Sequence, residues 1–178
     1  VDRRQRQMCI RDRGYAVDNP AVQAVTNGGA VGVRNIIVSK EYNAALNTDS
    51  LTITLPSGRK LYYISPQIYE NQWGSPSIAY MGMDQKTKKW TRLETYGGKL
   101  VENCVQAIAR DCLAGAITRL EEAGLPVVFH IHDEVVIDCR KDTASLEDVI
   151  RIMTEPIPWA PGLPLRADGW VGDFFRKD

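Results

Sequence analysis

Two short apolar runs on either side of three ionisable residues constrain the fold more than any other part of the chain. The runs cover residues Val127–Ile131 and Val135–Ile137, and both are rich in β-branched side chains. Between them stand His132, Asp133 and Glu134 in succession. Two short strands joined by a tight turn would account for this pattern. The sequence therefore predicts a β-hairpin whose tip carries an imidazole and two adjacent carboxylates.

This tip has two interpretations. An ordinary hairpin with a polar, solvated tip needs no function, and it would be the better interpretation of Asp133 and Glu134 alone. Carboxylate oxygens, however, are ligands of hard divalent cations, and Mg²⁺ is usually held by one or two of them together with substrate phosphates. The apolar flanking strands and the adjoining His132 favour a metal site that faces a phosphate.

Several stretches along the chain carry a resemblance to a known family. His132-Asp133-Glu134 between apolar strands resembles the palm hairpin (motif C) of family A, or DNA polymerase I-like, DNA polymerases. Further stretches resemble the phage and prophage branch of that family, in the expected order over roughly residues 50–178: Leu55–Arg59, Thr95–Leu100, Glu102–Asn103, Gln106–Asp111, Trp159–Leu165 and Gly169–Trp170.

The resemblance implies that the full-length protein carries out template-directed DNA synthesis, transferring nucleotides from dNTPs to a primer 3′-hydroxyl. In this family the reaction uses two Mg²⁺ ions per active site, for which Mn²⁺ can substitute. Carried over by position, Asp133 is expected to be a Mg²⁺ ligand, and Glu134 to lie in the outer shell of the metal or to support it. His132 is expected to approach the primer end; its alternative is a structural histidine hydrogen-bonded to the backbone.

Four further side chains are expected near primer-template DNA on the same grounds. Gln106 matches a glutamine that touches the minor groove, where purine N3 and pyrimidine O2 acceptors are common to all base pairs. Arg110, one helical turn later, could meet a phosphate, and Arg59 and Lys99 are candidates for further phosphate contacts. Each has a purely structural alternative: the polar face of a helix for Gln106, a charge pair with Asp111 for Arg110, and ordinary surface positions for Arg59 and Lys99.

The chain divides into three parts under this interpretation. Residues 1–13 are interpreted as a non-native, adaptor-like leader, with a basic nucleic-acid arm as the alternative. Residues 14–50 would be the end of the fingers region and a connector, and residues 51–178 the C-terminal palm portion. The second Asp-bearing strand of a palm and the fingers motif do not occur between Gly14 and Leu55. We therefore expect this fragment to be inactive alone and to need the N-terminal part of the same polymerase chain.

Hydrophobic periodicity predicts the strands. Leu51–Leu55 and Leu61–Ile64 flank a Pro-Ser-Gly-Arg turn and predict a hairpin. Val31–Ser39 and Ser77–Met83 are further expected strands, whereas residues 41–49 and 66–76 are expected to be loops. The run Lys86-Thr87-Lys88-Lys89 is interpreted as a solvated turn rather than a phosphate contact.

The predicted helices lie on either side of the 127–138 hairpin. Residues 100–123 carry apolar side chains at helical spacing and predict a helix of ~24 residues, with Gly124 as its C-terminal cap. The apolar positions of this helix are Val101, Val105, Ile108, Cys112, Ala116, Ile117 and Leu120. A shorter helix is expected at residues 145–153, with Ser145 and Asp148 as a capping box and with Leu146, Val149, Ile150 and Met153 covering the sheet. Residues 165–175 could add an edge strand or a closing tail.

Together these elements predict an α+β fold: a largely antiparallel sheet with a long packing helix. This is the palm-type architecture of a polymerase-domain fragment that the resemblance implies.

Composition excludes little. Lys plus Arg and Asp plus Glu both number 22, so the formal net charge is zero, which counts mildly against a self-contained DNA-binding domain. The four cysteines show no zinc spacing, and no apolar run is long enough to span a bilayer, so a cytoplasmic setting without a membrane partner is expected.

Three alternatives remain open: an enzyme like the single-subunit RNA polymerases, a His130/His132/Asp133 metallohydrolase, and a non-catalytic DNA-binding remnant.

Overall fold

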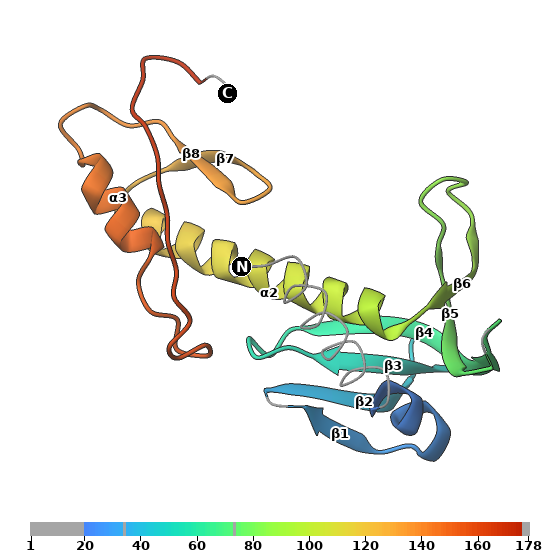
Figure 1. Cartoon of the computed structure of the whole chain (residues 1–178). Coiled ribbons are helices and arrows are strands. Elements are labelled where there is room, and N and C mark those ends of the chain that lie inside the picture. Colours follow the sequence, from blue (N-terminus) through green and yellow to red (C-terminus); the bar gives the residue numbers. More distant parts are fainter. Residues whose placement is uncertain (1–19, 34, 73, 176–178) are drawn as a thin grey trace. The chain divides into compact units, whose positions relative to one another are not determined.

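The chain forms two compact units, whose boundary lies within one helix. The computed structural model describes residues 20–33, 35–72 and 74–175 (Figure 1). The first unit is Val1–Gln106 and the second is Ala107–Asp178, and the boundary between them falls within helix α2 (Gly97–Glu122). The leader interpretation of residues 1–13 lies outside the described residues.

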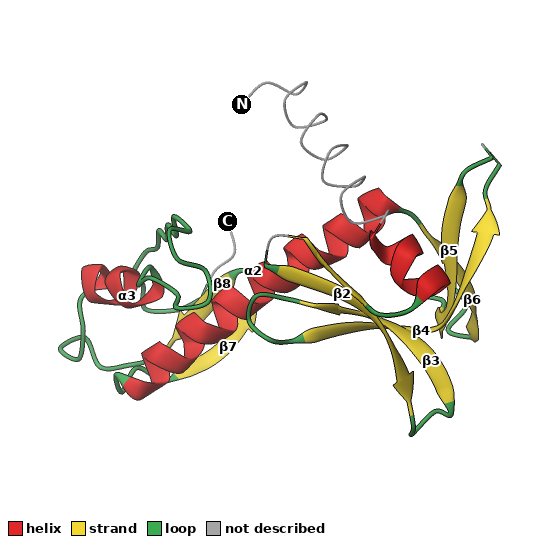
Figure 2. Ribbon diagram, turned by 90° about the horizontal axis from the view of Figure 1, so that it is seen from below, coloured by secondary structure: helices red, strands yellow, loops and turns green. Residues whose placement is uncertain are grey.

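An antiparallel sheet of six strands makes up most of the first unit (Figures 1 and 2). The strands pair in chain order, each antiparallel to the next. They are β1 (Ala30–Val33), β2 (Ile36–Asn43), β3 (Thr48–Thr54), β4 (Lys60–Glu70), β5 (Pro76–Met83) and β6 (Trp90–Thr95). The predicted α+β class with an antiparallel sheet is confirmed.

The core of the first unit lies on the sheet. Its buried apolar side chains include Val38, Leu51, Ile53, Ile78 and Leu100. The predicted hairpin at residues 51–64 is confirmed, with Leu51 opposite Tyr63 and Ile53 opposite Leu61. The described residues 20–27 are helical and bury Ala21, Ala24 and Val25.

Two predicted boundaries in the first half of the sheet are wrong. Val31–Ser39 is not one strand but parts of two, β1 and β2, which pair with Val33 opposite Ile36. The expected loop at residues 41–49 is mostly strand, because β2 continues to Asn43 and β3 begins at Thr48. Polar side chains hold this region through partners on neighbouring strands, and the Lys40 ammonium lies 3.0 Å from the Asp49 carboxylate.

The prediction of a loop at residues 66–76 is also wrong for residues 66–70, because β4 runs on to Glu70. A proline would normally interrupt a strand in this position, since it cannot donate to the hydrogen-bond ladder. Here the pairing with β5 shifts register between Ile64 and Gln67, and Ser65 adopts a φ of 49°. This irregularity accommodates Pro66 and lets the strand continue.

Helix α2 begins on the sheet of the first unit. Leu100, Val101 and Cys104 are buried there, and the Asn103 side-chain amide donates a 3.0 Å hydrogen bond to the Tyr63 hydroxyl. Val105 is half exposed, although the helical spacing placed it on the apolar face. Further along α2, the predicted Ala116 and Leu120 are buried, but Leu113 is buried in place of the predicted Cys112, which is only partly buried.

The second unit joins the end of α2 to a two-stranded sheet and helix α3. The strands are β7 (Val127–Ile131) and β8 (Glu134–Ile137), and α3 is Leu146–Met153. Its core consists of Leu120, Leu125 and Ile152, with partly buried apolar side chains packed around them: Val127, Val135, Ile137, Ala144, Val149 and Met153. The most buried residue of α3 is thus Ile152, which the predicted covering set did not include.

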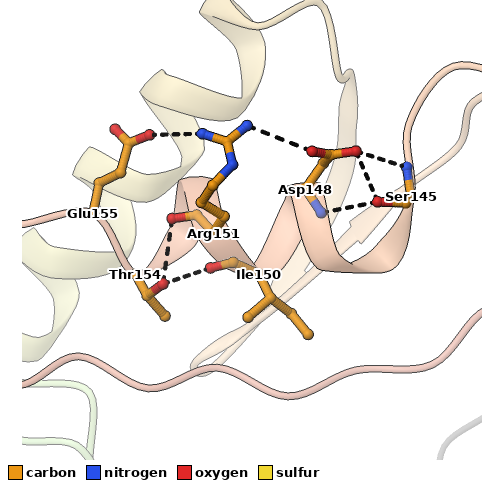
Figure 3. A network of polar contacts seen from close by, with 6 residues as sticks. All are labelled: Ser145, Asp148, Ile150, Arg151, Thr154 and Glu155. Atoms are coloured by element: carbon orange, nitrogen blue, oxygen red, sulfur yellow. Dashed lines mark hydrogen bonds and ion pairs between the residues drawn. The ribbon is translucent and has the colours of Figure 1, made fainter.

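Helix α3 starts with the predicted capping box (Figure 3). The Ser145 hydroxyl accepts a 3.1 Å hydrogen bond from the Asp148 amide, and the Asp148 carboxylate accepts one of 3.3 Å from the Ser145 amide. At the other end, the Arg119 guanidinium of α2 donates to the carbonyl oxygens of Ile152 and Met153, where a helix leaves carbonyls without partners. Side chains therefore provide hydrogen-bond partners for backbone groups at both ends of this short helix.

After α3, the described residues to position 175 form no helix or strand. The tail contacts the hairpin instead: the Phe175 ring lies edge-on to Phe129 of β7, with 5.2 Å between ring centroids. Of the two alternatives for residues 165–175, the closing tail is the one observed.

Candidate active site

The hairpin that the sequence predicted is present as β7 and β8. Ile131 pairs with Glu134, so His132 and Asp133 alone form the turn, and Glu134 is the first residue of β8. All three ionisable residues are solvent-exposed. The structure therefore places His132, Asp133 and Glu134 together at the tip of the hairpin.

The base of this hairpin is tied to the end of α2. Gly124 takes a φ of 77°, its amide donates to the Glu121 carbonyl, and the Leu125 amide donates to the Leu120 carbonyl. This is the Schellman arrangement, and the expected apolar contact between Leu120 and Leu125 is part of the core. The Glu121 carboxylate accepts a 2.6 Å hydrogen bond from the Val127 amide and so fixes the first residue of β7.

The two strands of the hairpin are buried unequally. Val127, Val135 and Ile137 pack against the core of Leu120, Leu125 and Ile152, whereas residues 128–130 in the middle of β7 are exposed. The register shifts between Val127 and Phe129, which places an extra residue in β7. The hairpin thus packs on the core through Val127 and through β8 as far as Val135, while the side chains at its tip are exposed.

The turn has one unusual backbone conformation. His132 has a φ of 51°, in the left-handed region that non-glycine residues seldom adopt. His130 lies within β7, whereas His132 lies in the turn, so strand alternation ends at Ile131 and does not relate the two histidines. The sequence carried no signal for this conformation beyond the tightness of the turn.

Asp133 and Glu134 form a pair of adjacent negative charges. Within the described part of the chain, neither carboxylate takes part in an ion pair or a side-chain hydrogen bond, and both face solvent. Two exposed carboxylates are suitable oxygen donors for Mg²⁺, which binds through one or two carboxylates and retains water or substrate oxygens. No group of three or more His, Cys, Asp or Glu side chains among residues 20–175 that are described could hold a metal ion by itself.

The remaining predicted residues are distributed over both units. Arg59 ends the turn between β3 and β4, and Lys99 lies in the first turn of α2; both are exposed. Gln106 is exposed on α2, where its side-chain amide donates a 3.2 Å hydrogen bond to Glu102. Arg110 is exposed on α2 in the second unit. Of these four, only Arg110 belongs to the same unit as the hairpin.

The first unit also contains a pocket of about 780 Å³. It lies beside β4–β6, and its lining includes Tyr69, Asn71, Glu94 and Tyr96. Two of these lining residues are joined by a 3.1 Å hydrogen bond from the Tyr69 hydroxyl to the Glu94 carboxylate. None of the residues predicted to act in catalysis or DNA binding lines this pocket.

The described helices include none long and apolar enough to cross a membrane. No family model matches the chain, and no solved structure matches it. Over 165 residues, or 92% of its length, the chain is 50% identical to a protein of Bacillus phage SP02 named DNA polymerase. The chain spans about a quarter (24%) of the length of that relative.

Proposed function

We propose that this chain is the palm portion of a family A DNA polymerase of the phage and prophage branch. The full-length protein would carry out template-directed DNA synthesis with dNTPs on primer-template DNA. The observation that carries the proposal is an anchored hairpin with Asp133 and Glu134 exposed at its tip, in a chain half identical to a phage DNA polymerase.

Each residue of the tip has a distinct role in this proposal. Asp133 would be a direct ligand of Mg²⁺, and Glu134 would support the ion from the outer shell. His132 would contact the primer end, with its imidazole oriented by the left-handed turn. In nucleotidyl transfer, Mg²⁺ activates the attacking hydroxyl and neutralises charge on the phosphates. The hairpin contributes preorganisation, because its base is fixed by the α2 cap and the Leu120 cluster.

DNA contacts would come from side chains outside the hairpin. Gln106 and Arg110 of α2 would approach the minor groove and a phosphate, and Arg59 and Lys99 would meet backbone phosphates. A second carboxylate for the metal site and the groups that bind the dNTP would come from the rest of the polymerase chain. The 178-residue chain alone is then expected to give no Mg²⁺-dependent primer extension.

A chimaeric polymerase tests the proposal. The matching segment of the phage SP02 DNA polymerase is replaced by this chain, and primer extension is measured in Mg²⁺. We expect an active chimaera, a loss of at least about 100-fold for Asp133→Asn, and a loss of about 10- to 100-fold for Glu134→Gln, as is usual for outer-shell partners.

The matched control is Asp138→Asn, since Asp138 is an exposed carboxylate directly after β8 of the same hairpin. It is expected to extend primers at the rate of the parent chimaera. Undiminished extension by Asp133→Asn in an active chimaera would exclude Asp133 as a metal ligand. Extension by the 178-residue chain alone would show that no outside carboxylate is needed.

A further inference from the structure

The β5–β6 hairpin of the first unit carries a concentration of positive charge at its loop end. Its loop projects away from β1–β3 (Figure 1). Residues 84–92 contain Lys86, Lys88, Lys89 and Arg92 against the single carboxylate of Asp84, a net charge of +3 in a chain whose formal net charge is zero. All four cationic side chains are exposed, and none takes part in an ion pair with another described residue.

This loop is held in a defined conformation. The Asp84 carboxylate accepts hydrogen bonds from the Thr87 amide (2.6 Å), the Thr87 hydroxyl (2.9 Å) and the Lys86 amide (3.0 Å). The Asp84 backbone exchanges 2.9 Å hydrogen bonds with Lys88 and Lys89. Because Asp84 is occupied within the loop, the lysines are presented outward on a fixed turn.

The two faces of the hairpin differ in chemistry. Tyr80 and Leu93 close over Gly82 on one face, where a Cβ would lie only 3.0 Å from the Leu93 side chain. On the other face, Trp90 stands opposite Met83, and both are more than half exposed. Arg92 is two residues from Trp90 and therefore shares its face. An exposed indole thus shares a strand face with a guanidinium, and the loop that carries the three lysines directly precedes it in the sequence.

We propose that this hairpin binds single-stranded DNA, with phosphates at the lysines and Arg92 and an unstacked base on Trp90. Cationic side chains that follow a backbone, combined with an aromatic stacking platform, are how proteins bind single strands without sequence preference. A duplex hides its base faces, so an exposed indole favours a single strand. The choice of DNA rests on the proposed function, in which a template has single-stranded stretches.

Binding is measured with the 178-residue chain and a fluorescently labelled oligo(dT) of about 12 nucleotides, within the usual site size of one binding module. Anisotropy is recorded over a series of salt concentrations. Replacing Lys86, Lys88 and Lys89 together by Gln should reduce the slope of log K against log[salt] by about 2, since each single-strand phosphate contact contributes about 0.7.

The role of the indole is tested separately. Trp90→Ala should weaken binding about tenfold or more at fixed salt, and Trp90→Phe should retain most of it. The control for charge is the triple variant Arg140→Gln, Lys141→Gln, Arg166→Gln, which removes three exposed cations from the second unit. The control for an exposed aromatic is Tyr62→Ala on β4. Both controls should bind like the parent chain.

Several results would overturn the inference. These are no binding by the parent chain, unchanged binding by the lysine and Trp90 variants, or an equal loss in the charge control. Equal displacement of the oligonucleotide by polyglutamate would identify an acidic-protein surface instead. This measurement and the polymerase test can fail separately. If the β5–β6 variants bind DNA like the parent, the result for Asp133 in the chimaera is not affected. If the Asp133→Asn chimaera is active, the measured DNA binding of the β5–β6 hairpin is not affected.

Discussion

His132 combines an exposed imidazole with a backbone conformation that disfavours side chains. A left-handed residue costs roughly 1–2 kcal/mol for an ordinary amino acid and little for glycine. His132→Gly should therefore keep the free energy of unfolding within about 1 kcal/mol of the parent, since relief of strain is offset by the greater freedom of glycine in the unfolded chain. The β-branched His132→Val should be less stable than the Gly variant by about 1–2 kcal/mol.

Urea unfolding followed by circular dichroism measures this difference. His132→Asn is the matched control, because asparagine tolerates the left-handed region, and it should resemble the parent. Equal stability of the Val and Gly variants would mean that the turn does not impose its positive φ in solution. A variant that keeps stability but loses primer extension in the chimaera would separate the role of the imidazole from that of the backbone.

Tyr63 should make the stability of the first unit depend on pH in the alkaline range. Burial raises its pKa from 10.0 to about 12, although the hydrogen bond from Asn103 acts in the opposite direction. A pKa raised in the folded state gives stability that is fully present below pH 10 and is lost as the pH rises through about 12. Tyr63→Phe should cost about 1 kcal/mol at neutral pH, because Asn103 loses its acceptor, and should lose less stability than the parent between pH 10 and 12.

Unfolding measured at pH 7 and pH 11, with absorbance at 295 nm reporting tyrosinate, checks this prediction. Tyr62, the exposed neighbour on β4, provides the control variant Tyr62→Phe. Parallel loss of stability by the parent and Tyr63→Phe above pH 10 would assign the alkaline transition to other groups.

At the scale of elements, α3 depends on its caps. The helix has only eight residues, and helices this short are marginal without tertiary contacts. Figure 3 shows the Ser145–Asp148 box at one end and the Arg151 pairs with Asp148 and Glu155 along the exposed side. Ser145→Ala should lower the free energy of unfolding by about 1 kcal/mol at pH 7.

The same cap should respond to acid. The Ser145 hydroxyl, by hydrogen bonding, is the first cause that lowers the pKa of Asp148 below its usual 3.8. A lowered pKa gives stability that is present above the usual value and is lost as the pH falls through the lowered one. The difference between Ser145→Ala and the parent should therefore shrink in thermal unfolding at pH 2 to 3. A difference that stays constant from pH 7 into acid would contradict a role for the Asp148 carboxylate in the cap.

At the scale of the whole molecule, the formal net charge is zero, but the charged residues are unevenly distributed. The β5–β6 loop is positive, and the β7–β8 tip has two adjacent carboxylates. These features suit opposite ligands, phosphates in the first case and divalent cations in the second. The chain covers about a quarter of its phage relative, and under the proposed function this tip would be completed by groups from the rest of the polymerase chain.

Metal removal tests that combination in the chimaeric polymerase. Chelation with EDTA should abolish primer extension, and excess Mg²⁺ or Mn²⁺ should restore it. Glu134→Gln should raise the Mg²⁺ concentration needed for half-maximal activity by about 10- to 100-fold, whereas Asp138→Asn should not change it. An unchanged Mg²⁺ requirement in Glu134→Gln would show that Glu134 does not support the metal.

Local sequence chemistry determined several features of this protein. The β7–β8 hairpin, the Gly124 cap of α2 and the Ser145–Asp148 box were all predictable, because each depends on residues close together in the chain. The position of His132, Asp133 and Glu134 at one hairpin tip was predictable to the same extent, since they are consecutive, whereas their roles remain a proposal. Their relation to Arg59, Lys99 and Gln106 was expected only from a resemblance and remains a proposal.

Only the tertiary structure decided the features that depend on distant partners. The polar end of β2 is strand because it pairs with β3 as far as Asn43, and there Lys40 and Glu41 form ion pairs with Asp49 and Lys60. β4 passes through Pro66 because its pairing with β5 shifts register there. Helical spacing alone could not choose between Cys112 and Leu113 as the buried position of α2. In each case contacts with distant residues decided the conformation or the burial of a residue. Strand pairing and burial can stabilise a conformation that the local sequence does not favour.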